Sequence, residues 1–141
     1  MKKKVLTPKT PAEAFDEAEL FFSNAKETLT KIQIKYDAYE KPKYVKEASA
    51  MGYLAALRAI DGYLLSKGIP PKNLPSSIIE YQQVIAKIPH NGRLIYALEL
   101  AYQDLHIFGY YRGGIGVNMI KEGFNNARYI IDTLSKTSNK K

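Results

Sequence analysis

The sequence predicts an all-α protein, an antiparallel bundle of four long helices and one short helix. Apolar residues recur at intervals of three and four along most of the 141 residues, which is the helical period. No run alternates with a period of two for long enough to indicate a strand, and capping residues, glycines and prolines divide the chain into five segments. The length suits one domain, which we place at residues 10–135 between flexible basic tails at 1–9 and 136–141.

The first two helices have clear boundary signals. Thr10 is a capping residue followed by proline and, three positions on, by a glutamate that can close a capping box. We expect this helix to fade around Tyr36. The second helix should run from about Tyr44 to Lys67, with Gly68 as its left-handed cap. Its apolar residues cover more than one face, which predicts that this helix is central.

Three further helices follow a turn-rich connector. Ser77 begins a second capping-box pattern and predicts a short helix to about Ile88. The fourth helix is expected over 94–108 with Gly109 as its cap, and the last helix over 117–134.

The formal net charge of +7 lies in the two tails, whereas the body between them is neutral. Terminal blocks of like charge are usually solvated, so we expect only weak, salt-sensitive attraction to polyanions. The tail lysines are Lys2, Lys3, Lys4, Lys9, Lys136, Lys140 and Lys141.

The composition also bears on whether the chain binds a metal or a cofactor and whether it crosses a membrane. The chain contains no cysteine and two histidines, without a His-x-x-x-His or Glu-x-x-His pair, so we expect neither a metal nor a cofactor. No apolar stretch is long enough to span a membrane, and the basic N-terminus lacks the apolar region of a signal peptide. A soluble cytoplasmic protein is predicted.

Unusual residues concentrate at the break between the last two predicted helices. His106, Tyr110, Tyr111 and Arg112 lie within seven residues beside a group of glycines. The glycine spacing does not match a phosphate loop, because no Gly-Lys-Ser/Thr sequence follows and Met119 stands where a third glycine is needed. An anion bound at the start of the last helix, near Arg112, is still compatible with the pattern.

A second candidate is the pair Arg58 and Asp61, three residues apart on the central helix. They can form an intrahelical ion pair, which we prefer, or join His106, Tyr110 and Arg112 in a buried polar cluster. For His106 the simplest partner is Tyr102, one turn earlier. No nucleophile motif or acid–base pair is present, so the sequence contains no recognisable catalytic site.

Two stretches resemble HEPN domains, small helical bundles found beside nucleotidyltransferases and in toxin systems. The stretch GYLAALRAIDGYLLSKGIPPKNL at 52–74 is similar to the second helix and connector of that fold. The run AYQDLHIFGYYRGG and the later GFNNARYIID resemble its C-terminal half. The ribonuclease motif of the family, Arg-x(4–6)-His, is missing, because the nearest arginine before His106 is Arg93. The resemblance therefore implies a non-catalytic member from an uncharacterised bacterial family.

These observations favour a non-enzymatic interaction protein that forms a homodimer or binds another protein. The tyrosines cluster at helix connections, where aromatic side chains anchor interfaces more readily than they stack on bases. The alternative is nucleotide or RNA binding through a pocket of Arg58, His106, Tyr110, Tyr111 and Arg112. A regulatory subunit of a nucleotidyltransferase is a third hypothesis.

Overall fold

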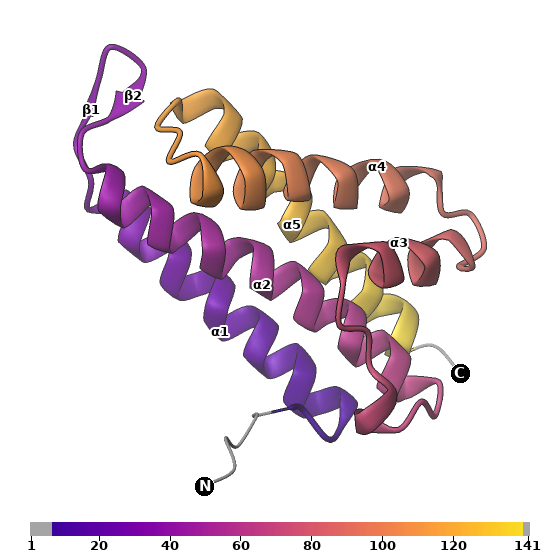
Figure 1. Ribbon diagram of the computed structural model, residues 1–141. Coiled ribbons are helices and arrows are strands. Elements are labelled where there is room, and N and C mark those ends of the chain that lie inside the picture. The colour runs from indigo at the N-terminus through magenta and orange to yellow at the C-terminus, as the bar shows by residue number, and fades with distance from the viewer. Residues whose placement is uncertain (1–6, 140–141) are drawn as a thin grey trace, which may run out of the picture.

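The computed structural model describes residues 7–139 and is predominantly helical, which agrees broadly with the predicted all-α class (Figure 1). Three single helices contain 20, 25 and 23 residues, whereas the fourth predicted long helix is two consecutive segments of 10 residues each. The elements are α1 Pro11–Thr30, β1 Ile34–Lys35, β2 Ala38–Tyr39, α2 Pro42–Ser66, η1 Pro71–Asn73, α3 Ile78–Ala86, α4 Gly92–Ala101, η2 Tyr102–Tyr111 and α5 Val117–Asn139.

The first helix begins as predicted but ends earlier. The Thr10 hydroxyl accepts a hydrogen bond from the Glu13 backbone N–H at 3.1 Å, so the predicted cap is confirmed. The extension to Tyr36 is wrong, because α1 ends at Thr30 and the chain enters a hairpin. Tyr36 and Asp37 form its turn with φ angles of 54° and 59°, the left-handed conformation that two-residue hairpin turns require.

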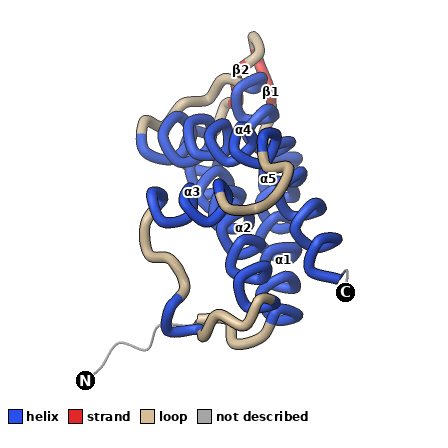
Figure 2. The backbone as a smooth tube through the Cα atoms, turned by 90° about the vertical axis from the view of Figure 1, so that its right-hand side faces the viewer, coloured by secondary structure: helices blue, strands red, loops and turns tan. Residues whose placement is uncertain are grey.

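The hairpin also corrects the expectation that the chain contains no strand. Its strands have only two residues each, too few to produce an alternating pattern in the sequence. The hairpin is held against a distant segment, because the Tyr39 N–H donates to the Ile115 carbonyl at 2.9 Å and the Val117 N–H donates to the Asp37 carbonyl at 3.0 Å. Figure 2 shows the strands at one end of the helical body.

The helix α2 is central, as predicted, because it packs against α1, α5 and η2. It begins two residues before the expected Tyr44, with Pro42 in its first turn. Gly68 follows its C-terminus with a φ of 88°, which confirms the predicted left-handed cap. Among the aromatic contacts of the core, the rings of Phe22 and Phe124 meet edge to face with centroids 5.7 Å apart.

The helix after α4 differs most from the prediction. Instead of ending at Gly109, the chain continues as the π-helical segment η2, which ends with the Arg112 N–H donating to the Ile107 carbonyl at 2.8 Å. Gly109 is therefore not a cap. It lies against Ser49 of α2, and the left-handed residue that follows the helix is Gly113, with a φ of 69°.

The ends of the chain are partly described. Pro8 is buried, so this residue of the predicted tail at 1–9 packs against the folded body. The helix α5 continues through Asn139, so residues 136–139 belong to the last helix and not to the predicted second tail. Residues 1–6 and 140–141 of the predicted flexible tails lie outside the described residues. Within residues 7–139, no helix has the length and apolarity needed to cross a bilayer.

Candidate functional site

The predicted pair on α2 forms an ion pair that extends to two neighbouring helices. Arg58 Nη1 donates to Asp61 Oδ2 at 3.2 Å, and Arg58 Nε lies 3.0 Å from Glu17 Oε1 of α1. The Tyr81 hydroxyl of α3 donates to Asp61 Oδ1 at 2.9 Å. These contacts join α1, α2 and α3 around one buried carboxyl group.

Burial raises the pKa of Asp61 to about 6, although hydrogen bonds from Tyr81 and Arg58 lower it in part. The same burial raises the pKa of the Tyr81 hydroxyl above its usual value. Both oxygens of Asp61 are occupied by donors from this network. We therefore interpret Asp61 as a structural group that fixes α3 against α2, because its two donors come from these two helices and its side chain is only 2% exposed.

His106 lies in a stack of aromatic rings along η2. Its ring centroid is 5.4 Å from that of Tyr102 and 6.0 Å from that of Tyr110, and Tyr53 of α2 lies 4.9 Å away. The expected partner Tyr102 is thus confirmed. The stack opens to solvent at Tyr110, where Lys46 Nζ lies 5.9 Å from the ring centroid.

Tyr111 and Arg112 are exposed at the end of η2. The Arg112 guanidinium carbon lies 5.4 Å from the centroid of the Tyr111 ring, a cation–π distance. At the start of α5, where the sequence is compatible with a bound anion, the Val117 N–H already donates to the Asp37 carbonyl.

The structure divides the six candidate residues into separate groups. Arg58 and Asp61 belong to the network with Tyr81, and His106 and Tyr110 belong to the aromatic stack. Within residues 7–139, no hydrogen bond or ion pair connects Arg58 with His106, Tyr110 or Arg112.

Sequence reasoning missed the buried carboxyl group of Asp104 on η2. Burial, together with the nearby Glu122 of α5, raises its pKa to about 7. No sequence pattern marks this pair, since the two residues come from different helices. In the described part of the chain, no group of three or more histidine, cysteine, aspartate or glutamate side chains is arranged to hold a metal ion.

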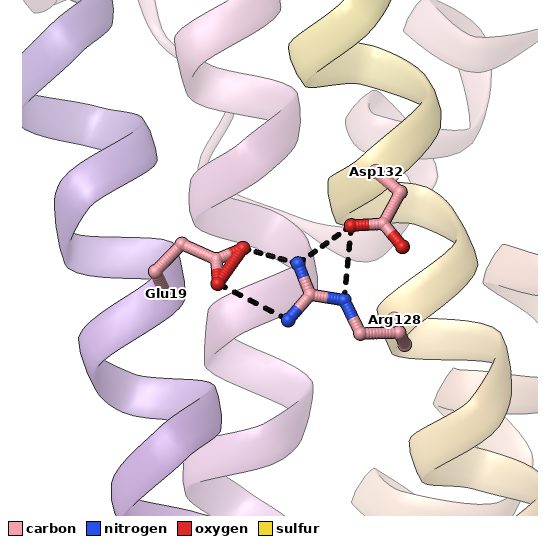
Figure 3. Close-up of polar contacts among 3 residues, drawn as sticks. All are labelled: Glu19, Arg128 and Asp132. Atoms are coloured by element: carbon pink, nitrogen blue, oxygen red, sulfur yellow. Dashed lines mark hydrogen bonds and ion pairs between the residues drawn. The ribbon is translucent and has the colours of Figure 1, made fainter.

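A second missed feature is the ion-pair network between α1 and α5 (Figure 3). Arg128 donates through both terminal nitrogens to Glu19, with Nη1 3.1 Å from Oε2, and through Nε and Nη2 to Asp132 Oδ1 at 3.0 and 2.7 Å. The hydrogen bond with Glu19 contributes most to raising the pKa of Arg128. The guanidinium also covers the Phe22 ring at 4.8 Å, so its contacts stabilise the packing of α5 on α1.

The fold and these contacts define a small, predominantly helical domain whose conspicuous polar residues mostly join helices. Residues 13–136 match the family described as Domain of unknown function (DUF5618), and the chain belongs to that family. A solved protein of unknown function from Dyadobacter fermentans is similar, with a TM-score of 0.76 and 27% identity over 91% of this chain and 98% of its own. No curated protein matched the chain.

Proposed function

We propose that the protein is a non-enzymatic, HEPN-like interaction module that forms a homodimer in the cytoplasm. The observation that carries the proposal is a surface on α3 and α4, here called the α3–α4 face. On it Ile79 and Tyr96 are each 62% exposed and Ile95 is 45% exposed. Large apolar side chains so exposed are typical of surfaces that another protein covers.

The α3–α4 face also contains a groove into which a partner side chain can insert. The groove has a volume of about 180 Å³ and is lined by Ile85, Ile95 and Leu98, with Gln82 and Glu99 completing the lining. An apolar groove beside exposed apolar side chains suits an interface in which each copy fills the groove of the other.

Charge favours self-association through the α3–α4 face over self-association through the end of the molecule near the hairpin. A two-fold interface brings identical surfaces together, so a surplus of one charge causes repulsion. The charged residues of 78–101 are two acids and two bases, Glu80, Glu99, Lys87 and Arg93. The end of the molecule near the hairpin instead has five bases, Lys35, Lys41, Lys43, Lys46 and Arg112, against three acids, Asp37, Glu40 and Glu47.

Sedimentation velocity over a wide concentration range tests the proposal. We expect a dimer for the natural chain and at least about 30-fold weaker association for the double variant Ile95→Glu, Tyr96→Glu, as for a central interface residue. Leu20→Glu is the matched control, because Leu20 is 56% exposed on α1, away from the face. A strict monomer, or a double variant that associates like the natural chain, would show that the proposal is wrong.

A second candidate, nucleotide or RNA binding, is favoured by the hairpin end. Four exposed tyrosines there form what we call the aromatic end, and Tyr36 is 90% exposed. Each has a cation between 5.4 and 5.9 Å from its ring centroid. Exposed rings beside cations suit single-stranded nucleic acid. The pairs are Tyr36 with Lys35, Tyr44 with Lys43, Tyr110 with Lys46 and Tyr111 with Arg112.

Binding of a fluorescent single-stranded RNA, titrated at low and physiological salt, tests this second candidate. Binding that survives physiological salt and falls about tenfold in His106→Ala, Arg112→Ala supports it. The control is His90→Ala, Arg93→Ala, which removes the other histidine and an arginine of α4. Loss of binding at modest salt, or equal loss in both variants, would indicate nonspecific attraction and contradict it.

A further inference from the structure

A pocket of about 290 Å³ lies where the end of α1, the hairpin and the first turns of α5 meet. Leu29, Ile32, Tyr39 and Phe124 supply buried apolar walls, and Thr30 lies among the lining residues. This volume is close to the lower limit for pockets that hold small organic molecules. The remaining lining residues are Lys26, Ile34 and Lys121.

The polar groups at this pocket are dominated by two lysines. Lys26 Nζ lies 5.9 Å from the centroid of the Phe124 ring, and Lys121 precedes Phe124 by one helical turn on α5. Within residues 7–139, neither lysine has a carboxylate within 4.0 Å. No acidic side chain lines the pocket. An apolar cavity therefore carries two positive charges that the described residues do not neutralise.

The nearby acids are engaged elsewhere. Glu27, next to Lys26, pairs with Lys31 at 3.2 Å. Glu122, next to Lys121, acts on Asp104, whose pKa it raises. The two helix ends at the pocket have opposite partial charges, since α1 ends there and α5 begins there, so the lysines decide the sign of the local potential.

We propose that this pocket binds a small organic carboxylate with an aromatic or branched aliphatic body. The body replaces water against Leu29, Tyr39 and Phe124, and the carboxylate lies between the ammonium groups of Lys26 and Lys121. Apolar walls supply affinity through buried area, and a few placed charges supply selectivity for an anion. This site is separate from the α3–α4 face and does not depend on dimer formation.

The test uses the full chain, 1-naphthoate as probe and its uncharged analogue 1-naphthalenemethanol, followed by NMR chemical shifts and calorimetry. We expect naphthoate to shift the Tyr39 and Phe124 ring signals and to bind at least about tenfold more tightly than the alcohol, a difference of about 1.4 kcal/mol. The alcohol gains the apolar contacts but not the charge interaction.

Three variants separate the contribution of the two lysine charges to binding from that of the apolar walls. Lys26→Gln, Lys121→Gln should weaken naphthoate about tenfold and change the affinity for the alcohol less than about twofold. Lys35→Gln, Lys41→Gln is the charge-matched control. Thr30→Trp should fill the opening and weaken both probes.

The proposal is overturned by any of three results. Naphthoate could leave the pocket signals unchanged at millimolar concentration, the two probes could bind equally, or the control pair could weaken naphthoate as much as Lys26→Gln, Lys121→Gln. Sedimentation of the same samples reports self-association independently, so failure of one proposal is distinguishable from failure of the other.

Discussion

The contact between Gly109 of η2 and Ser49 of α2 gives a sharp test of how these helices pack. A Cβ atom on Gly109 would overlap the Ser49 hydroxyl oxygen and lie 2.6 Å from Ser49 Cβ and 3.0 Å from Ile120 Cδ1. Rotating the Ser49 side chain moves its oxygen but not its Cβ, so Gly109→Ala must push the two helices apart.

The expected magnitude follows from two opposing effects. Overpacking of a close-packed site costs about 1–3 kcal/mol, whereas alanine is favoured over glycine inside a helix by up to about 1 kcal/mol. We expect Gly109→Ala to lower the free energy of unfolding by about 1–2 kcal/mol, since the clash involves a rigid Cβ. Urea denaturation followed by circular dichroism measures this as a lower midpoint with an unchanged slope.

Two further variants control the experiment. Gly92→Ala introduces a Cβ with no neighbour within 4 Å, so it should leave stability unchanged or raise it slightly. Adding Ser49→Gly to Gly109→Ala removes the Ser49 Cβ atom with which the new alanine Cβ clashes. The double-mutant cycle should therefore show a favourable coupling above about 0.5 kcal/mol. If Gly109→Ala is as stable as Gly92→Ala, the close approach of α2 and η2 is refuted.

Three other predictions concern buried polar groups and the hairpin. Burial raises the pKa of Asp61 to about 6 and, together with Glu122, that of Asp104 to about 7, both above the usual value for aspartate, so both groups hold protons more tightly in the folded state. The stability that these two protonated groups contribute is therefore complete below pH about 4 and is lost as the pH rises through 6 and 7. The midpoint of urea unfolding should fall over that interval, and Asp104→Asn should reduce the fall. A midpoint that rises with pH would contradict the burial argument. Tyr81→Phe removes the donor to Asp61 Oδ1 and should cost about 1–3 kcal/mol in urea unfolding, while an unchanged midpoint would mean that water replaces the hydroxyl. Tyr36→Gly should raise the free energy of unfolding by about 1 kcal/mol, because Tyr36 has a φ of 54°, a left-handed conformation that strains a residue with a side chain. A midpoint temperature of unfolding that is unchanged or lower would show that this tyrosine is not strained.

Much of the helical structure could be predicted from local chemistry. The caps at Thr10 and Ser77 depend on side chains that reach backbone groups three residues away, and both are observed. The apolar stripe of α5 depends only on the helical period, and its members from Val117 to Leu134 are buried. Gly68 ends α2 because glycine adopts the left-handed conformation without steric cost.

The candidate site was predicted in its parts but not in its arrangement. The pairing of Arg58 with Asp61, and of His106 with Tyr102, follows from the spacing of neighbours on one helix. Whether Arg58 lies near His106 could not be judged from spacing, because it depends on which face each helix turns to its neighbour. The structure places Glu17 beside Arg58 and Tyr53 beside His106.

The sequence by itself determined the helical class, most helix starts and the buried stripes, because these depend on interactions within a few residues. Only the tertiary structure decided the hairpin, the π-helical segment and the partners of Asp61 and Asp104. The hairpin is held by residues about 80 positions away, where the Tyr39 N–H meets the Ile115 carbonyl, and Gly109 packs on Ser49 of another helix. Contacts of this kind leave no periodic signal in either segment, since each residue's conformation is selected by a partner that only folding brings near.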